Sequence, residues 1–158
     1  MTEKKIAIIR IKGDSGLKKP LRDTFKLLRL YKKNNCVVVS NTKVFAGMIT
    51  KVKDSITWGE IDEPTFKILL EKRGKLPQNQ KLTEQYLKDK VKISFDEFVK
   101  EFFASQKQLK DIPGLKLFFK LNPPRGGFER QGVKIAYSLG GALGYRKDKI
   151  NDLIKRMA

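Results

Sequence analysis

Three short runs decide the fold: KKIAIIRI (residues 4–11), CVVVS (36–40) and ITW (56–58). Each run is rich in β-branched or aromatic residues and is flanked by charged or turn-forming residues, which predicts a β-strand. The segments between the runs are long enough for a helix each. The first sixty residues therefore predict the order strand, helix, strand, helix, strand.

The two helices of this unit can be delimited from their end signals. The first is predicted from residues 18–20, where a proline suits the first turn, to Tyr31. The second is capped by Asn41 or Thr42 and ends near Val52. Two such helices can cover one face of a small sheet. Helical crossovers of this length favour strands that run in the same direction, although the pattern alone leaves strand direction open.

Residues 63–111 are predicted to be a mostly helical accessory region. One helix runs from Pro64 to Arg73, a second covers Thr83–Lys88, and Gly74–Lys81 resembles a loop. The sequence SFDE at residues 94–97 is a capping box that opens a third helix, and its phenylalanines have the spacing of core residues.

Residues 112–158 predict a strand within Leu115–Leu121, two loops rich in glycine, and a closing helix at Lys147–Met157. The loops are NPPRGGF (122–128) and GGALGYR (140–146). Proline lacks the donor that regular structure needs, and glycine tolerates unusual dihedral angles. We expect three segments, 1–62, 63–111 and 112–158, that pack together as one unit.

Charge is the strongest functional signal in the chain. There are 35 Lys and Arg against 17 Asp and Glu in 158 residues, a net charge of +18, which favours an anionic partner, above all nucleic acid. Residues 15–53 contain ten basic residues and one acid, Asp23. Five of the ten have the spacing of one helix face, which stacks like charges that a polyanion would neutralise: Lys18, Arg22, Lys26, Arg29 and Lys33.

The two loops add an arginine each, together with glycines that let the backbone approach a phosphate closely. Neither loop has the sequence of a nucleotide-binding loop. Two tight turns without a ligand are the alternative interpretation. Trp58 and Tyr31 are candidates for base stacking as well, with core packing favoured for Trp58, whereas Phe128 and Tyr145 lie in polar loops and suit stacking better. The predicted RNA contacts are Lys18, Lys19, Arg22, Lys26, Arg29, Lys32, Lys33, Lys51, Lys53, Arg125, Gly126, Gly127, Phe128, Arg146 and Lys147.

Other functional classes find little support in the composition. The chain has no histidine and a single cysteine, Cys36, which lies in an apolar run and is expected to be a buried thiol. The only tight group of acids is Glu60, Asp62 and Glu63, which suits solvated turn residues better than a Mg²⁺ site. We therefore expect no enzyme, no metal and no cofactor. No run approaches the about 18 apolar residues of a membrane span. Residues 1–10 lack the features of a signal peptide, so we expect a cytoplasmic protein.

The quoted segments resemble a known family. Residues 6–13, the basic first helix, GMITKVKD (47–54) and TWGEI (57–61) are similar to the large-subunit ribosomal proteins named L-thirty, or L-seven in eukaryotes. The likeness continues in LNPPRGGF (121–128), GGALGYR (140–146) and INDLIKRM (150–157), and the chain length resembles the archaeal form. Asn122 departs from the family, whose archaeal members often have histidine before the two prolines.

This resemblance implies an α+β fold with a ferredoxin-like βαβαβ core and a small antiparallel sheet. It also implies a structural component of the large ribosomal subunit that binds large-subunit ribosomal RNA near the 5S RNA, beside other ribosomal proteins. The family contacts carried over are the basic first helix, residues 51–53 and the PPRGG loop. We expect no homo-oligomer. The alternative is a basic nucleic-acid-binding protein outside the ribosome, either one that compacts DNA or an RNA chaperone.

Overall fold

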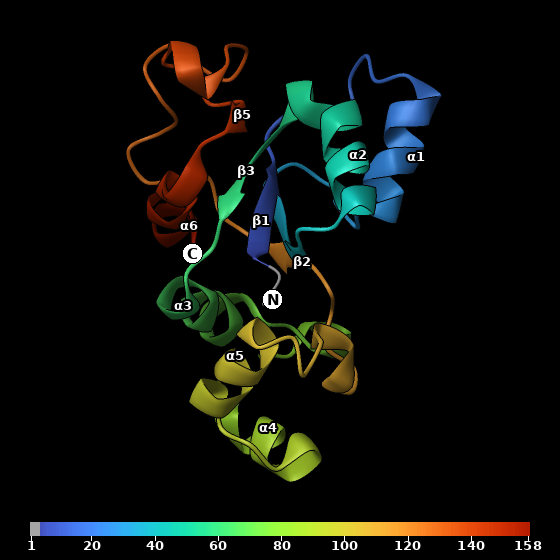
Figure 1. The fold of residues 1–158 in the computed structure, drawn as a ribbon, viewed down its shortest axis with the longest axis vertical. Coiled ribbons are helices and arrows are strands. Elements are labelled where there is room, and N and C mark those ends of the chain that lie inside the picture. The colour runs from blue at the N-terminus through green and yellow to red at the C-terminus, as the bar shows by residue number, and fades with distance from the viewer. Residues whose placement is uncertain (1–3) are drawn as a thin grey trace.

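The computed structural model describes residues 4–158, and a mixed sheet runs through the centre of this part (Figure 1). The five strands of the described part lie in the order β4-β2-β1-β3-β5. Their bounds are β1 Lys5–Arg10, β2 Asn35–Ser40, β3 Ile56–Glu60, β4 Phe119–Lys120 and β5 Gly144–Tyr145. The central strand β1 is antiparallel to both β2 and β3. The antiparallel core implied by the family resemblance is thus confirmed, and the parallel direction favoured by crossover length is wrong.

Residues of β1 alternate between the two faces of the sheet, as the period of a strand requires. Ile6 and Ile8 belong to a buried cluster with Phe25, Leu28, Ile49 and Val52, which come from the helices on one face and their ends. These helices are α1 (Lys19–Leu27) and α2 (Lys43–Val52). The prediction that two helices cover one face is confirmed.

Ala7 and Ile9 face the opposite layer, whose core contains α3 (Glu63–Arg73), α5 (Phe95–Phe103) and α6 (Ile150–Met157). Phe66 stacks on Phe102 with ring centroids 4.5 Å apart, and α5 opens with the predicted capping box at Ser94. The remaining α-helix is α4 (Glu84–Val91), which lies with α5 at the end of the molecule away from α1 (Figure 1). Short 3-10 turns complete the described chain: η1 Lys53–Ser55, η2 Pro77–Asn79, η3 Leu109–Asp111, η4 Tyr137–Leu139 and η5 Lys147–Lys149.

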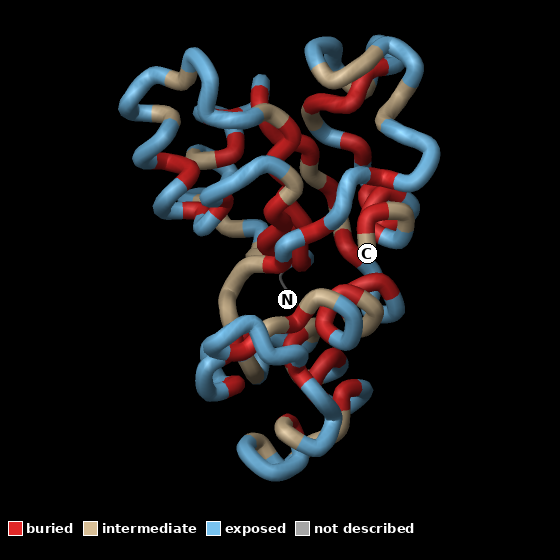
Figure 2. The backbone as a smooth tube through the Cα atoms, turned by 180° about the vertical axis from the view of Figure 1, so that it is seen from behind, coloured by how far each residue is buried: buried red, intermediate tan, exposed pale blue. Residues whose placement is uncertain are grey.

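One buried cluster contains residues of all three predicted segments, for example Ile9, Phe98 and Leu153. Figure 2 shows buried residues, in red, in both the upper and the lower part of the molecule. The boundaries of the segments 1–62, 63–111 and 112–158 stay a prediction. Residues 1–3, which belong to the first segment and to the run searched for a signal peptide, lie outside the described range.

Several element boundaries differ from the sequence prediction. The strand expected within 115–121 is only two residues long, because β4 pairs with just Asn35 and Cys36 of β2. Part of the second glycine-rich loop is regular, since β5 runs parallel to β3. The closing helix starts at Ile150 rather than Lys147, and η5 precedes it. Cys36 is fully buried, as predicted, and burial raises the pKa of its thiol.

Candidate nucleic-acid interface

The outer face of α1 carries the first group of predicted contacts. Thr24 and Phe25 are the buried residues of this helix, so the opposite side faces solvent. Pro20 occupies the first turn and Lys18 precedes the helix with an extended backbone. The side chains of four cations at this helix are exposed: Lys18, Lys19, Arg22 and Lys26. The only acid among them, Asp23, is exposed too. These positions form a cationic surface, and their side chains take no part in packing the apolar core.

The helix ends earlier than predicted, and the predicted stripe of five cations ends with it. Leu28 is the C-cap, and Arg29 has a left-handed φ of 59°. The amide of Leu30 donates to the carbonyl of Phe25 (2.9 Å) and that of Arg29 to Lys26 (3.0 Å), which is a Schellman motif. Glycine usually fills the left-handed position, and its absence hid the helix end in the sequence. Arg29 and Lys33 are therefore exposed loop residues and do not continue the helix face.

Lys51 and Lys53 lie at the end of α2 and in η1, and both are exposed. The carbonyl of Ser55 accepts hydrogen bonds from the amides of Ile11 (2.9 Å) and Lys12 (3.2 Å). These bonds place the end of α2 beside the end of β1, from which the chain continues to α1. The two helices also lie side by side (Figure 1). The basic residues of α1 and α2 thus belong to one layer of the molecule.

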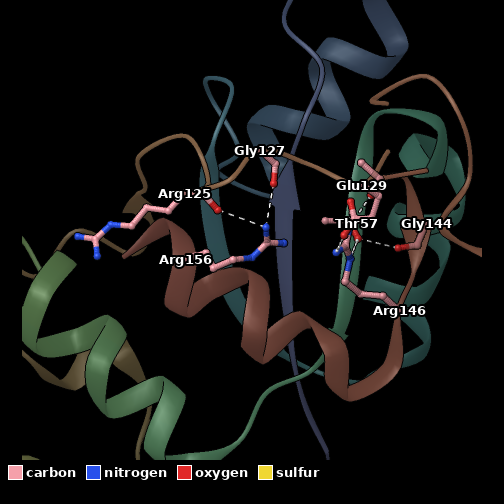
Figure 3. Close-up of polar contacts among 8 residues, drawn as sticks. Thr57, Arg125, Gly127, Glu129, Gly144, Arg146 and Arg156 are labelled. Atoms are coloured by element: carbon pink, nitrogen blue, oxygen red, sulfur yellow. Dashed lines mark hydrogen bonds and ion pairs between the residues drawn. The ribbon is translucent and has the colours of Figure 1, made fainter. Parts of the chain in front are cut away.

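The PPRGG loop (residues 123–127) docks on the C-terminal end of α6 (Figure 3). The amide of Arg125 donates to the carbonyl of Arg156 (3.1 Å), and Nη1 of Arg156 donates to the carbonyl of Gly127 (2.8 Å). Gly126 and Gly127 have φ of 78° and 76°, a conformation that glycine adopts without strain. The exposed side chain of Arg125 points away from α6. Arg156, which the sequence analysis did not select, shapes this loop.

The structure does not bring all predicted contacts onto one face. α1 and α2 cover one side of the sheet, while α6, with the PPRGG loop, covers the other. The turn that contains Lys32 and Lys33 connects the two sides. The backbone amide of Asn34, in this turn, donates to the carbonyl of Arg10 (2.8 Å). The backbone carbonyl of Asn34 accepts from the amide of Leu121 (3.1 Å), which lies just before the PPRGG loop. Both lysines of this turn are exposed.

The structure argues against the predicted RNA contact of Arg146, because the guanidinium of this residue lies inside the protein. The residue is 2% exposed, and its side chain donates to Thr57 Oγ1 (2.7 Å), Glu129 Oε1 (2.6 Å) and the carbonyl of Ala142 (2.7 Å) (Figure 3). A guanidinium with these partners is not available to a phosphate. Its role is to hold the 129–146 segment on β3. The neighbouring Lys147 is exposed, as a contact residue must be.

The aromatic candidates separate into packed and exposed rings. Phe128 is half-buried and packs against two apolar clusters, so the structure favours packing over the predicted base contact. Trp58 is half-buried against the core, as predicted, with its ring centroid 6.2 Å from that of Tyr145. The hydroxyl of Tyr145 donates to Glu60 (2.5 Å), and this hydrogen bond, together with burial and the charges of Glu60 and Asp148, raises the pKa of Tyr145 to about 12.

Among the described residues, no three potential metal ligands lie close enough together to hold a metal ion, and the acids at 60–63 form no such group either. Among the helices of residues 4–158, none has the length and apolar character that crossing a bilayer requires. The geometry offers a set of exposed cations at α1, at the end of α2 and in the loops that flank the sheet.

Comparison with known proteins gives consistent matches. Residues 6–56 match the family model described as ribosomal protein L30p/L7e. The chain is 45% identical over 151 residues to large ribosomal subunit protein uL30 of Methanococcus maripaludis, covering 96% of this chain and 97% of the relative. The protein of the same name from Nanoarchaeum equitans is 47% identical over 150 residues (95% and 96%), and that from Methanopyrus kandleri 43% over 148 (93% and 99%). The chain therefore belongs to the L30p/L7e family of ribosomal proteins, known as uL30 in the large subunit.

Proposed function

We propose that this protein is a structural, non-catalytic component of the large ribosomal subunit that binds large-subunit ribosomal RNA. The observation that carries the proposal is the row of exposed cations on α1, which a folded helix does not need for its own stability. Lysine acts as a point charge toward phosphates, so this surface suits recognition of backbone and shape with little reading of bases.

The proposed contact set follows from exposure. It keeps the exposed cations at α1, the loop cations Arg29, Lys32 and Lys33, then Lys51 and Lys53, the PPRGG loop and Lys147. Arg146 is removed because it is buried, and Phe128 is removed as a base contact because it is half-buried and packs against two apolar clusters. Arg125 gains from its loop, where Gly126 and Gly127 are exposed. The Gly127 amide already donates to the Pro124 carbonyl (3.0 Å), so the Gly126 amide is the donor that the loop can add.

The finer assignments come from the family resemblance and from charge. We propose that the bound RNA lies near the 5S RNA and that other ribosomal proteins are neighbours, in cytoplasmic ribosomes and without homo-oligomer formation. Residues 63–111, where charge is closer to balance, form an accessory region that meets RNA or a neighbouring protein. The competing function is general nucleic-acid binding by charge, as in DNA compaction or RNA chaperoning.

The experiment measures RNA binding as a function of salt. Lys26→Ala and Arg22→Ala should weaken binding to large-subunit ribosomal RNA, each lowering the slope of log K against log salt by about one unit. Lys72→Ala, in exposed α3 sequence outside the proposed set, is the matched control and should leave the slope unchanged. A slope unaffected by Lys26→Ala and Arg22→Ala removes α1 from the interface. Equal affinity for random DNA duplex would support the competing function instead.

A further inference from the structure

The loop that follows α1, residues 28–34, is held in an unusual conformation. Arg29 and Asn34 have φ of 59° and 65°, and neither is glycine. A residue other than glycine keeps this left-handed conformation only where its surroundings impose it. We call residues 28–34 the Tyr31 loop, after the aromatic residue at its centre.

Arg10 at the end of β1 holds the Tyr31 loop from inside the protein. Only 1% of Arg10 is exposed, and its Nη1 donates to the carbonyls of Leu30 (2.9 Å) and Tyr31 (3.1 Å). Its other nitrogens donate to the carbonyl of Lys12 (2.9 Å) and to Asp14 (2.6 Å). The guanidinium also lies over the ring of Phe25, 4.2 Å from its centroid. By binding the carbonyls of Leu30 and Tyr31, this buried guanidinium fixes the two peptide groups on either side of the Tyr31 Cα.

The ring of Tyr31 is presented to solvent on this fixed backbone. Tyr31 is 46% exposed, and its ring meets Phe118 edge to face, with centroids 5.3 Å apart at 78°. The Phe118 contact orients the ring and leaves nearly half of the residue uncovered. Three exposed cations lie in the same loop: Arg29, Lys32 and Lys33.

We propose that the Tyr31 loop binds one unpaired nucleotide of RNA, with the base stacked on Tyr31 and the adjoining phosphates on Arg29, Lys32 and Lys33. Stacking on exposed aromatic rings is how proteins engage bases outside a helix, whereas a paired helix hides its base faces. The proposal rests on the proposed RNA-binding function and adds to it a site for a base. Phosphate binding alone would need no aromatic ring.

Tyr145 provides the matched comparison within the same chain. It is also 46% exposed, but its hydroxyl donates to Glu60, and Asp148 lies close enough to raise the pKa of Tyr145 further. A carboxylate beside the ring repels the phosphates that accompany a base. The two tyrosines therefore have equal exposure, but carboxylates stand beside Tyr145 among the cations Lys147 and Lys149, whereas the Tyr31 loop carries cations and no acid, which predicts stacking at Tyr31.

The test uses a hairpin RNA with a single bulged 2-aminopurine, and the same hairpin fully paired as reference. The wild-type protein should bind the bulged hairpin more tightly and quench 2-aminopurine fluorescence. Tyr31→Leu, which keeps an apolar contact with Phe118, should weaken binding to the bulged hairpin about tenfold without changing the salt slope. Binding to the paired hairpin should not change. Tyr31→Phe should retain quenching, and Tyr145→Leu should behave as wild type.

Equal weakening of both hairpins by Tyr31→Leu, or no weakening of either, overturns the proposal. Unchanged RNA binding with reduced incorporation of Tyr31→Leu into large subunits also overturns it, because the ring would then face a protein. These results leave the proposed function intact when Lys26→Ala still lowers the salt slope. If the wild-type protein does not bind large-subunit ribosomal RNA, the proposed function itself is refuted.

Discussion

Replacing Arg146 by alanine tests the assignment of this residue to structure rather than to RNA contact. The substitution removes the donors to Thr57, Glu129 and the Ala142 carbonyl at once. Thr57 and Ala142 are fully buried, and the Ala142 carbonyl loses its guanidinium donor there, whereas Thr57 Oγ1 keeps its bond to the Gly144 carbonyl (2.9 Å). The Glu129 carboxylate loses the guanidinium that neutralises it at 2.6 Å.

The magnitude follows from burial of the pair. Removing one partner of a buried ion pair costs about 3–5 kcal/mol, because the other charge stays without compensation. The side chain of Arg146 is 1% exposed and that of Glu129 is 21% exposed. Water can reach part of Glu129, so we take the lower end, about 3 kcal/mol. For a chain of this length that corresponds to a fall in Tm of roughly 6–12 °C.

The assay is thermal unfolding followed by circular dichroism, with Arg125→Ala as the matched control. Arg125 is exposed, so its replacement should change stability by less than about 0.5 kcal/mol and should weaken RNA binding instead. In a double-mutant cycle, the variant with both Arg146→Ala and Glu129→Ala should lose less free energy of unfolding than the sum of the losses of the two single variants. A melting temperature of Arg146→Ala within a degree of wild type would refute the reasoning.

Two further predictions concern buried positions. Gly59→Ala should lower the free energy of unfolding by about 1–3 kcal/mol, because a Cβ there would lie 1.9 Å from the Lys147 carbonyl oxygen. Gly47→Ala is the control and should be neutral or stabilising, because the space around its Cβ is open. Urea unfolding measures both. Cys36 should not react with an aromatic disulfide reagent at pH 8, because burial raises its pKa and keeps the thiol protonated, and it should react fully once the protein is denatured. Modification of the native protein at the rate of the denatured one would contradict the buried position.

The local patterns of the sequence were sufficient for most of the architecture. The three runs of β-branched residues became β1, β2 and β3, and the SFDE box became the start of α5. Strand direction depends on which strands become neighbours, and β1 lies between β2 and β3 with both antiparallel to it. That is a property of the whole sheet, which the length of a crossover does not determine. The family resemblance supplied it instead.

The arrangement of the candidate site depends on features that the local sequence does not encode. The stripe of five cations assumed a helix through Tyr31, but Arg29 adopts a left-handed cap without glycine to signal it. Arg146 has the same sequence context as Arg125, a glycine-rich loop, and only tertiary contacts distinguish the buried residue from the exposed one. Arg10 did carry a signal. It follows Ile6 and Ile8 on the face of β1 toward α1, and a charge on an apolar face needs partners inside the protein.

The most direct measurement is crosslinking from a photoreactive group placed at Lys26 in a cell extract. Lys26 lies on the exposed face of α1, so the group projects from the proposed contact surface. The account predicts crosslinks to one defined region of large-subunit ribosomal RNA in particles that sediment as large subunits. Crosslinks spread over messenger RNA or DNA, with none to that ribosomal RNA, would contradict it.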